Sequence, residues 1–423
     1  MVLLFFILSS LPAYGQSVLV RKDREFEPKT LSLPYAFYNK SFGVAAGYVH
    51  GYAGYPQKQM TLLATLIAGT NDALAFYVMT RDIQSPLERI FLDADLALST
   101  FGTNNSYANG NPAFAHERAG SNDSDKDNYI EGRGMDNIAR VKFRYLLPIG
   151  SGENEVITTQ VIDRGQLIEG AVGGDSWNPF ESGRTYFEMR PFWRQQTINT
   201  DDNEVNRRTN GVDISLYWEN TDLPKNPSHG NTVRTRYTED CGWFDSSNPY
   251  NVADIEYSQY FSFGESEHFR QQVLAFDFWT VNAISWNRSD VEDGKIVYRR
   301  PPSYAGAALG GLWRLRGYPL NRFNDRAAIY YAVEYRMTPE WNPFADIEWL
   351  QKYFEVAWWQ VVPFFEVGRV ASSWELNTLH SSMKWDVGVG MRAMAKGLVV
   401  RVDMAVSEED CGVQMMVGHP FQF

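Results

Sequence analysis

The histidines and serines of this chain are the first residues to test for catalytic chemistry. Six histidines are present, and none stands in a metal-ligand spacing such as His-Glu-x-x-His. Ser228 directly precedes His229, but neighbours in sequence rarely form a working nucleophile and base. We therefore predict that the protein is not an enzyme and that it binds no cofactor.

An acidic cluster at residues 123–128 offers oxygen ligands of the kind that calcium prefers. It reads Asp-Ser-Asp-Lys-Asp-Asn, and calcium loops use alternate carboxylates in this way. In the register of an EF-hand, however, the sixth position is Asn128 instead of glycine. The twelfth position is Gly134, which has no carboxylate. We favour a solvated loop over a calcium site and predict no metal site.

A third candidate is the tripeptide Arg316, Gly317 and Tyr318, which follows Leu315 in a long insertion. The insertion covers residues from about 287 to 326. An arginine inside a protein must be paired with carboxylates, because an unpaired buried charge is very costly. The motif therefore suggests a loop that docks through its arginine, and whether it docks depends on the carboxylates that the surrounding elements supply.

Those elements are strands, because apolar and polar residues alternate with period two from one end of the chain to the other. One apolar face consists of Leu398, Val400, Val402, Met404 and Val406. The opposite face of the same strand carries Arg401 and Asp403. Gly388 and Gly390 stand on the preceding strand with no helix after them, so we expect them to relieve crowding instead of binding phosphate.

About sixteen runs of this type are present, an even number as in bacterial barrels. They lie near 41–51, 57–69, 72–81, 88–101, 136–148, 154–168, 182–195, 207–219, 229–239, 250–263, 267–285, 327–338, 355–368, 382–393, 397–406 and 411–423. A soluble sandwich also alternates, but its strands are about six residues long, whereas a tilted membrane strand needs about ten. Aromatic residues make up 15 % of the chain, as interfacial girdles require. We predict an all-β fold, a transmembrane antiparallel β-barrel of about 16 strands.

The first residues have the pattern of a signal peptide. An apolar core at residues 2–11 precedes a small-residue pattern that ends at Gly15 and predicts cleavage there. We expect residues 1–15 to be removed, residues 16–40 to form a short periplasmic segment, and residues 41–423 to form a barrel in the cell outer membrane.

Charge and cysteine content limit the partners and the covalent links. The net charge of −12 provides no basic surface to neutralise phosphates, which excludes nucleic acid as a partner. Export would place Cys241 and Cys411 in an oxidising compartment, where a disulfide is allowed. Both are predicted to lie in loops on the same face of the barrel, and we favour two unpaired cysteines over a bridge.

The insertion that contains Arg316 resembles the long sixth extracellular loop of the BamA/TamA family, the bacterial surface antigen superfamily of assembly and translocation barrels. Its second half reads Leu-Gly-Gly-Leu-Trp-Arg-Leu-Arg-Gly-Tyr-Pro at 309–319, and members of the family carry Arg-Gly-Phe/Tyr at the tip of this loop. Here too the insertion lies between the eleventh and twelfth predicted strands. Three further stretches are similar to the family, namely Glu334-Tyr335-Arg336, residues 364–369 and the turn containing Pro227 and Gly230.

The resemblance implies that the loop folds back into the lumen. Glu334 and Glu366 fall on the lumen-facing side of their predicted strands, so we predict that Arg316 docks against one or both of them. Gly317 is expected to allow the turn at the tip. The alternative is an exposed loop arginine without particular contacts.

The resemblance also implies an activity, the insertion or translocation of proteins or lipids at the outer membrane. Translocating members of the family place periplasmic POTRA domains before the barrel, and the segment 16–40 is too short to fold as one. The first hypothesis is therefore a barrel that acts as a single copy in outer-membrane lipid, on unfolded outer-membrane proteins or with a separate periplasmic partner. The resemblance implies a weakly paired seam between the first and last strands, and Pro420 is consistent with this because it removes a backbone donor there.

Two other hypotheses remain open. One is a passive transport pore, and the other is a structural surface antigen whose acidic loops bind partners or shield the cell. In a pore, lumen charges would set selectivity. The candidate lumen charges are Arg140, Lys142, Arg144, Arg184, Arg190 and Arg194. We favour the first hypothesis because the loop motif is specific to the family.

Overall fold

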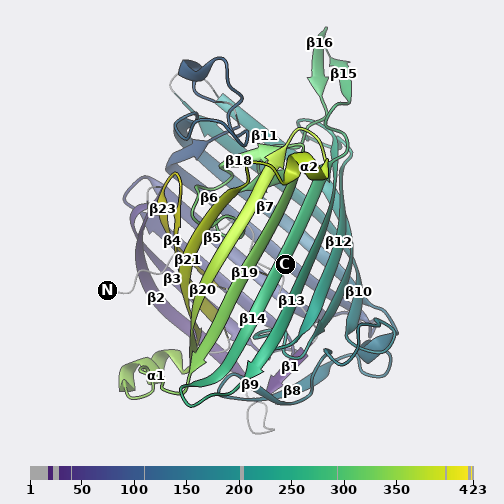
Figure 1. Ribbon diagram of the computed structural model, residues 1–423, viewed down its shortest axis with the longest axis vertical. Coiled ribbons are helices and arrows are strands. Elements are labelled where there is room, and N and C mark those ends of the chain that lie inside the picture. The colour runs from purple at the N-terminus through teal and green to yellow at the C-terminus, as the bar shows by residue number, and fades with distance from the viewer. Residues whose placement is uncertain are drawn as a thin grey trace.

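The chain folds into one large antiparallel sheet of 16 strands, which curves into a wall of tilted strands (Figure 1). The computed structural model describes residues 18–21, 28–39, 41–108, 110–200, 204–292, 294–395, 398–417 and 421. The predicted signal peptide at 1–15 lies outside the described residues. Among the described residues, no helix is both long and apolar enough to cross a membrane.

Each strand of the sheet pairs with its neighbour along the chain, except at two positions where other elements are inserted. The strands in order are β2 (Lys29–Asn39), β3 (Gly43–Ala53), β4 (Thr61–Gly69), β5 (Ala73–Gln84), β6 (Ile90–Ser106), β7 (Ile130–Leu146), β10 (Arg184–Asn199), β11 (Glu204–Thr221), β12 (Gly230–Asp240), β13 (Tyr250–Gly264), β14 (Phe269–Ala283), β19 (Ala327–Pro339), β20 (Val356–Ala371), β21 (Lys384–Ala395), β22 (Leu398–Ser407) and β23 (Cys411–Val417). The predicted number of about sixteen strands is confirmed.

Burial alternates along the strands with period two, as the sequence predicts. On β22, Arg401 and Asp403 are buried on the lumen side, whereas Met404 and Val406 are exposed on the outer surface. Large apolar side chains recur on that outer surface: Val44, Leu66, Phe76, Leu98, Val141, Phe143, Ile214, Leu216 and Val387. A polar lumen inside an apolar outer wall is the arrangement that a lipid-facing barrel requires.

Two strand predictions are wrong: one predicted barrel strand is not part of the barrel, and one barrel strand was not predicted. The total number of barrel strands is therefore unaffected. The sequence predicts a barrel strand at 154–168, but this stretch contains β8 (Thr158–Asp163) and β9 (Gln166–Glu169), which form a separate sheet with β1 (Val18–Arg21). Strands this short alternate like a barrel strand but cannot span a membrane.

The other error concerns the predicted periplasmic segment 16–40, which contains β2, the first strand of the barrel. Pro34 lies within β2 and makes the sequence look unlike a strand, because proline cannot donate to a ladder. It is tolerated here since β2 is an edge of the sheet and pairs only with β3 among the described residues.

Inserted elements lie at the two ends of the barrel (Figure 1). The β1–β8–β9 sheet and α1 (Glu348–Phe354) lie at one end. Loop 6, which we define as residues 284–326 between β14 and β19, lies at the other. It contains two hairpins, β15 (Ser289–Glu292) with β16 (Lys295–Tyr298), and β17 (Ala307–Leu309) with β18 (Phe323–Asp325). The first hairpin projects beyond the barrel, whereas β18 lies at its mouth.

The two edges of the sheet meet at what we call the seam. Among the described residues, no hydrogen-bonded register joins β2 to β23. Instead, Val400 and Val402 on the outward face of β22 pack against a cluster of lumen-facing residues that includes Tyr35, Val49 and Leu63. Because an outward face touches an inward face, the C-terminal edge lies inside the N-terminal edge.

Candidate functional site in the lumen

Loop 6 turns sharply just before the arginine motif. Gly310 and Gly311 have φ angles of +103° and +108°, in a region that side chains strongly disfavour. The Gly310 N–H donates to the Arg314 carbonyl at 2.9 Å, and the Gly311 N–H donates to the Tyr318 carbonyl at 3.1 Å. These bonds close a compact turn whose tip is Arg316.

The Arg316 guanidinium is fully buried and contacts three carboxylates. Its Nη2 lies 3.1 Å from Glu334 Oε1, and its Nε lies 3.1 Å from Glu366 Oε1. Its Nη1 lies 2.9 Å from Oδ2 of Asp403, a partner that the sequence reasoning missed. The Arg316 backbone N–H also donates to Glu366 Oε2 at 2.7 Å. The structure thus brings the arginine together with both predicted acids and with one more.

An aromatic ring supports the same guanidinium from one face. The Cζ of Arg316 lies 3.5 Å from the centre of the Phe364 ring, within range of a cation–π contact. Gly388 on β21 makes room for this ring, since a Cβ at that position would lie 2.4 Å from it. The glycine therefore relieves crowding in the lumen, as its place on a strand predicts.

Further arginines surround the carboxylates. Arg392 Nη2 lies 2.6 Å from Glu334 Oε1, and Arg336 Nε donates to Glu334 Oε2 at 3.0 Å. Arg401 Nη1 lies 3.1 Å from Asp403 Oδ2. We call the whole set the arginine network: Arg316, Arg336, Arg392 and Arg401 with Glu334, Glu366, Asp386 and Asp403. Each of the four arginines has at least one carboxylate partner, as the burial of a charge requires.

The role predicted for Gly317 differs from the one observed. The turn at the tip is made by Leu315, whose φ is +55°, and not by the glycine. Gly317 is needed for close approach, because a Cβ there would lie 2.8 Å from the Cβ of Asp386 and 3.1 Å from that of Ser407. Its N–H donates to Asp386 Oδ2 at 2.8 Å, a contact that only a residue this close can make.

The remaining residues of the motif fix the tip to the last strands. Gln414 on β23 donates from Nε2 to the Arg316 carbonyl at 2.6 Å. The Tyr318 hydroxyl donates to the Trp385 carbonyl on β21 at 3.1 Å. Leu315 is fully buried in an apolar cluster. The tip therefore contacts all five consecutive strands from β19 to β23.

Loop 6 also contacts two other loops at the same end of the barrel. Arg322 Nε lies 2.7 Å from Glu409, which is in loop 8 (residues 408–410). Arg322 Nη1 donates to Ser124 Oγ at 2.9 Å, in loop 3 (residues 107–129). Ser124 is buried in this contact, whereas Asp123, Asp125, Lys126 and Asp127 are exposed, so the charged side chains of the acidic stretch are solvated as predicted.

The six predicted lumen charges do lie on the inner wall, and each has a protein partner. The ion pairs are Arg140 with Asp95, Lys142 with Glu188, Arg144 with Asp82 and Asp93, Arg190 with Asp213, and Arg194 with Asp136. Arg184 instead donates to the Thr158 hydroxyl at 2.6 Å and to the Val156 carbonyl. Pairing of this kind reduces the field that a passing ion would meet.

The serine–histidine pair is part of a turn. Ser228 Oγ donates to Asp222 Oδ2 at 2.5 Å, and His229 Nδ1 lies 3.5 Å from the same oxygen. A catalytic triad needs the histidine between serine and aspartate, and here both contact the aspartate. The hydrogen bond to Asp222 raises the pKa of His229. Burial alone would raise the pKa of Asp222, but hydrogen bonds from His229 and Ser228 lower it.

The other chemical candidates can be placed as well. Within the described ranges, no group of three or more His, Cys, Asp or Glu side chains is positioned to hold a metal ion. Cys241 and Cys411 are free and exposed, but Cys411 is the first residue of β23 and does not lie in a loop as predicted. Pro420 lies outside the described residues.

Comparison with known proteins identifies structures of similar fold but no protein of similar sequence. No protein-family model matches the chain, and no curated protein matches it. CdiB from Escherichia coli is similar in structure with a TM-score of 0.55 and 9 % identity, covering 92 % of this chain and 61 % of that one. CdiB from Acinetobacter baumannii gives a TM-score of 0.51 and 8 % identity, covering 92 % and 59 %.

A third solved structure, BamA from Haemophilus ducreyi lacking POTRA domains 1–3, gives a TM-score of 0.48 and 9 % identity, covering 92 % of this chain and 70 % of that one. The chain thus spans less than two thirds of the length of the two CdiB chains. At this level of identity the likeness concerns the fold.

Proposed function

Because the chain has a BamA/TamA-like barrel fold, we propose that it resides in the outer membrane and assists the insertion or translocation of proteins there. The observation that carries the proposal is the seam. Its two edges, β2 and β23, share no hydrogen-bonded register among the described residues, while the tip of loop 6 holds β19 to β23 together.

An unpaired strand edge is chemically suited to a client of a particular kind. It presents N–H and C=O groups with which another extended chain can pair. The client class that we propose is therefore an unfolded outer-membrane protein that can add a strand at the seam. A separate periplasmic protein would deliver it, and no step of this activity makes or breaks a covalent bond.

The seam also has a means of opening. Val400 and Val402 hold it by apolar packing, which is non-directional and can be broken gradually. The arginine network holds the neighbouring strands by charge-assisted contacts with fixed geometry. We propose that β2 moves away from β22 and β23 while the network keeps the last five strands together.

The test is a folding assay in liposomes that contain the purified barrel. An unfolded small outer-membrane protein is added from outside, and its folding is followed by the gel-mobility shift. We expect the wild type to accelerate folding and Arg316→Glu to fail, since the substitution places a fifth carboxylate in the network. Arg288→Glu, at an exposed position in the same loop, is the matched control and should act like the wild type. Equal client folding with and without the wild-type barrel would refute the proposal.

The passive pore is tested with the same proteoliposomes. It requires a path through the lumen and unpaired charges, whereas the tip of loop 6 lies in the lumen and the predicted lumen cations have protein partners. Steady ion conductance without acceleration of client folding would support the pore. The absence of both ion conductance and accelerated client folding would support a structural surface antigen.

A further inference from the structure

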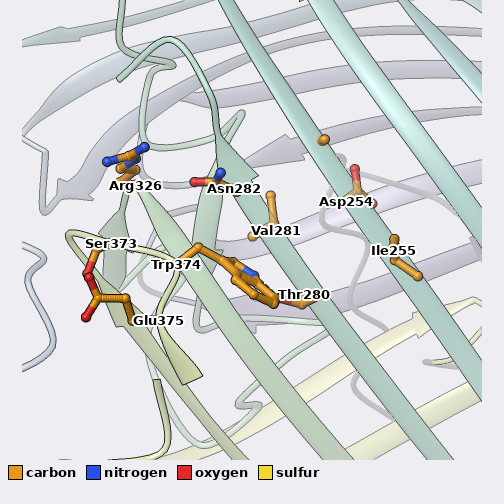
Figure 2. Close-up of a pocket in the computed structure, with 10 residues that line it drawn as sticks. Asp254, Ile255, Thr280, Val281, Asn282, Arg326, Ser373, Trp374 and Glu375 are labelled. Atoms are coloured by element: carbon orange, nitrogen blue, oxygen red, sulfur yellow. Dashed lines mark hydrogen bonds between the residues drawn. The ribbon is translucent and has the colours of Figure 1, made fainter. Parts of the chain in front are cut away.

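A second site lies on the outer wall of the barrel, away from the lumen. It is a pocket of about 510 Å³ between strands β13 and β14 on one side and loop 7 (residues 372–383) on the other (Figure 2). Trp374 of this loop donates from Nε1 to Thr280 Oγ1 at 2.8 Å. Leu379, in the short helix α2 (Leu376–Leu379), is fully buried against Ala327. Loop 7 is thus folded down onto the outward face of the strands and forms the second wall of the pocket.

The pocket has an apolar part and a polar part. The apolar part is formed by Ala253, Ile255 and the indole of Trp374. The polar part contains Asn282, Arg326, Ser373 and Glu375. A cavity of this size with an apolar lining and a few polar groups is typical of a small-ligand site. On the outward face of a membrane barrel, the molecules within reach are lipids.

Two polar atoms in the pocket lack partners within the described chain. Arg326 Nε is buried without a hydrogen-bond partner, and its guanidinium forms no ion pair there. Asn282 Oδ1 is likewise buried and accepts no hydrogen bond. A buried donor or acceptor without a partner costs free energy, so this pair of atoms points to a ligand that supplies both an acceptor and a donor.

We propose that this pocket binds one phospholipid with a phosphoethanolamine head group. The phosphate would face Arg326, because a guanidinium matches phosphate oxygens in charge and geometry. The ammonium would donate to Glu375 and to Asn282 Oδ1. One acyl chain would lie against Ile255 and Trp374.

Charge complementarity selects this head group over the alternatives. The lining contains one cation, Arg326, and two carboxylates, Glu375 and Asp254. Asp254 is already paired with Arg236, at 2.8 Å, so Arg326 and Glu375 are the charges left for a ligand and they balance. An anionic phosphoglycerol head group would leave the carboxylate facing another negative charge. A choline head group is neutral, but its quaternary nitrogen has no N–H and would leave Asn282 Oδ1 unsatisfied.

The test is native mass spectrometry of the whole barrel in detergent with an equimolar mixture of phosphatidylethanolamine, phosphatidylglycerol and phosphatidylcholine. We expect one bound lipid, with phosphatidylethanolamine retained about three- to tenfold more than either competitor, as one or two additional hydrogen bonds imply. Arg326→Gln should lower retention of every phospholipid. Glu375→Gln should abolish the preference for phosphatidylethanolamine over phosphatidylglycerol.

Two more variants separate a specific site from general lipid contact. Ile255→Trp fills the pocket without changing a charge and should expel the lipid, and its folding is checked by heat-modifiable gel mobility. Arg288→Gln removes an arginine at the same end of the barrel but outside the pocket, and should retain lipid like the wild type. Equal retention of the three lipids by the wild type, or an unchanged preference in Glu375→Gln, would overturn the proposal. The site requires only a barrel in a membrane, so the lipid proposal is tested independently of the proposed effect on client folding.

Discussion

The two sides of the seam are built from different kinds of side chain. On the N-terminal side the lumen-facing wall is apolar: Ala45, Val49, Leu63, Ile67 and Ala75 are all nearly or fully buried. On the C-terminal side the lumen-facing wall is the arginine network, in which charged groups are buried just as deeply. Both walls are closely packed, yet the N-terminal wall is held by non-directional apolar packing and the C-terminal wall by directional ion pairs and hydrogen bonds.

This difference indicates which side of the seam is able to move. Apolar packing depends on area and tolerates small displacements, whereas a buried ion network is stable only in a few arrangements. The C-terminal strands should therefore behave as one rigid unit, with loop 6 as part of it. The N-terminal strands should be the side that moves.

The largest effect is expected from breaking the charged side at Arg316. Arg316→Met leaves Glu366 without its arginine and should lower the free energy of unfolding by about 3–5 kcal/mol, since it leaves a buried carboxylate without an ion-pair partner. Arg316→Lys should be nearly as damaging, because one ammonium cannot bridge three carboxylates or stack on Phe364 as a planar group does. The measurement is urea unfolding of the barrel in detergent, followed by tryptophan fluorescence. Arg288→Met is the control, and a lysine variant as stable as the wild type would contradict the rigid charged side.

The apolar side should respond to volume and tolerate a change of shape. Leu63 is 2 % exposed, so Leu63→Ala is expected to cost about 2–5 kcal/mol by leaving a cavity. Leu63→Met keeps the volume and should cost less than about 1.5 kcal/mol. The same unfolding experiment compares this conservative change with Arg316→Lys. Equal losses from the two would show that the sides of the seam do not differ in tolerance.

A smaller effect is expected from adding one methyl group on each side. Gly388→Ala places a Cβ 2.2 Å from the Met404 carbonyl oxygen and 2.4 Å from the Phe364 ring, and should cost about 1–3 kcal/mol because the neighbouring strand and the ring must both shift. Gly51→Ala on β3 is the matched change, since its nearest non-neighbour atom is 3.3 Å away, and it should cost less. If the two variants unfold at the same urea concentration, the ring is not held as tightly as the contact distances imply.

The sequence predicts the charged side of the seam better than the apolar side. The contact of Arg316 with Glu334 and Glu366 was predictable from the sequence. The motif places the arginine at a loop tip, and period-two alternation places both acids in the lumen. Asp403 was missed, although the alternation on its strand already indicated a lumen position. Which lumen residues meet depends on the curvature of the sheet, and local sequence does not encode that distance.

The apolar side was harder to predict for a physical reason. Its strands are apolar on both faces, so alternation does not reveal which residues face the lumen. The edge strand β2 also contains Pro34, which is compatible with an edge but masks the strand pattern. Overlap at the seam places the outward face of β22 against an inward face, and no single strand shows this in its sequence.

The smallest effect is a pH dependence that lies outside both sides of the seam, at the turn between β11 and β12. Because Asp222 raises the pKa of His229, the charged histidine stabilises the fold fully below its ordinary pKa of 6.5, and this is lost as pH rises through the raised value. The depressed pKa of Asp222 gives a contribution that is lost only as pH falls below its ordinary 3.8. Asp175 and the Ser228 hydroxyl are the other polar groups facing this pair.

His229→Gln should therefore flatten the decline in stability as pH rises above the ordinary histidine pKa of 6.5, by less than about 1 kcal/mol because the ring is half exposed. The urea midpoint of the wild type and of the variant would be measured across that range. A decline that persists in His229→Gln would have to come from titration elsewhere, and adding Arg316→Met to that variant would show whether the arginine network is its source. In that case the charged side of the seam would be the pH-sensitive side, and its rigidity would hold only over part of the pH range.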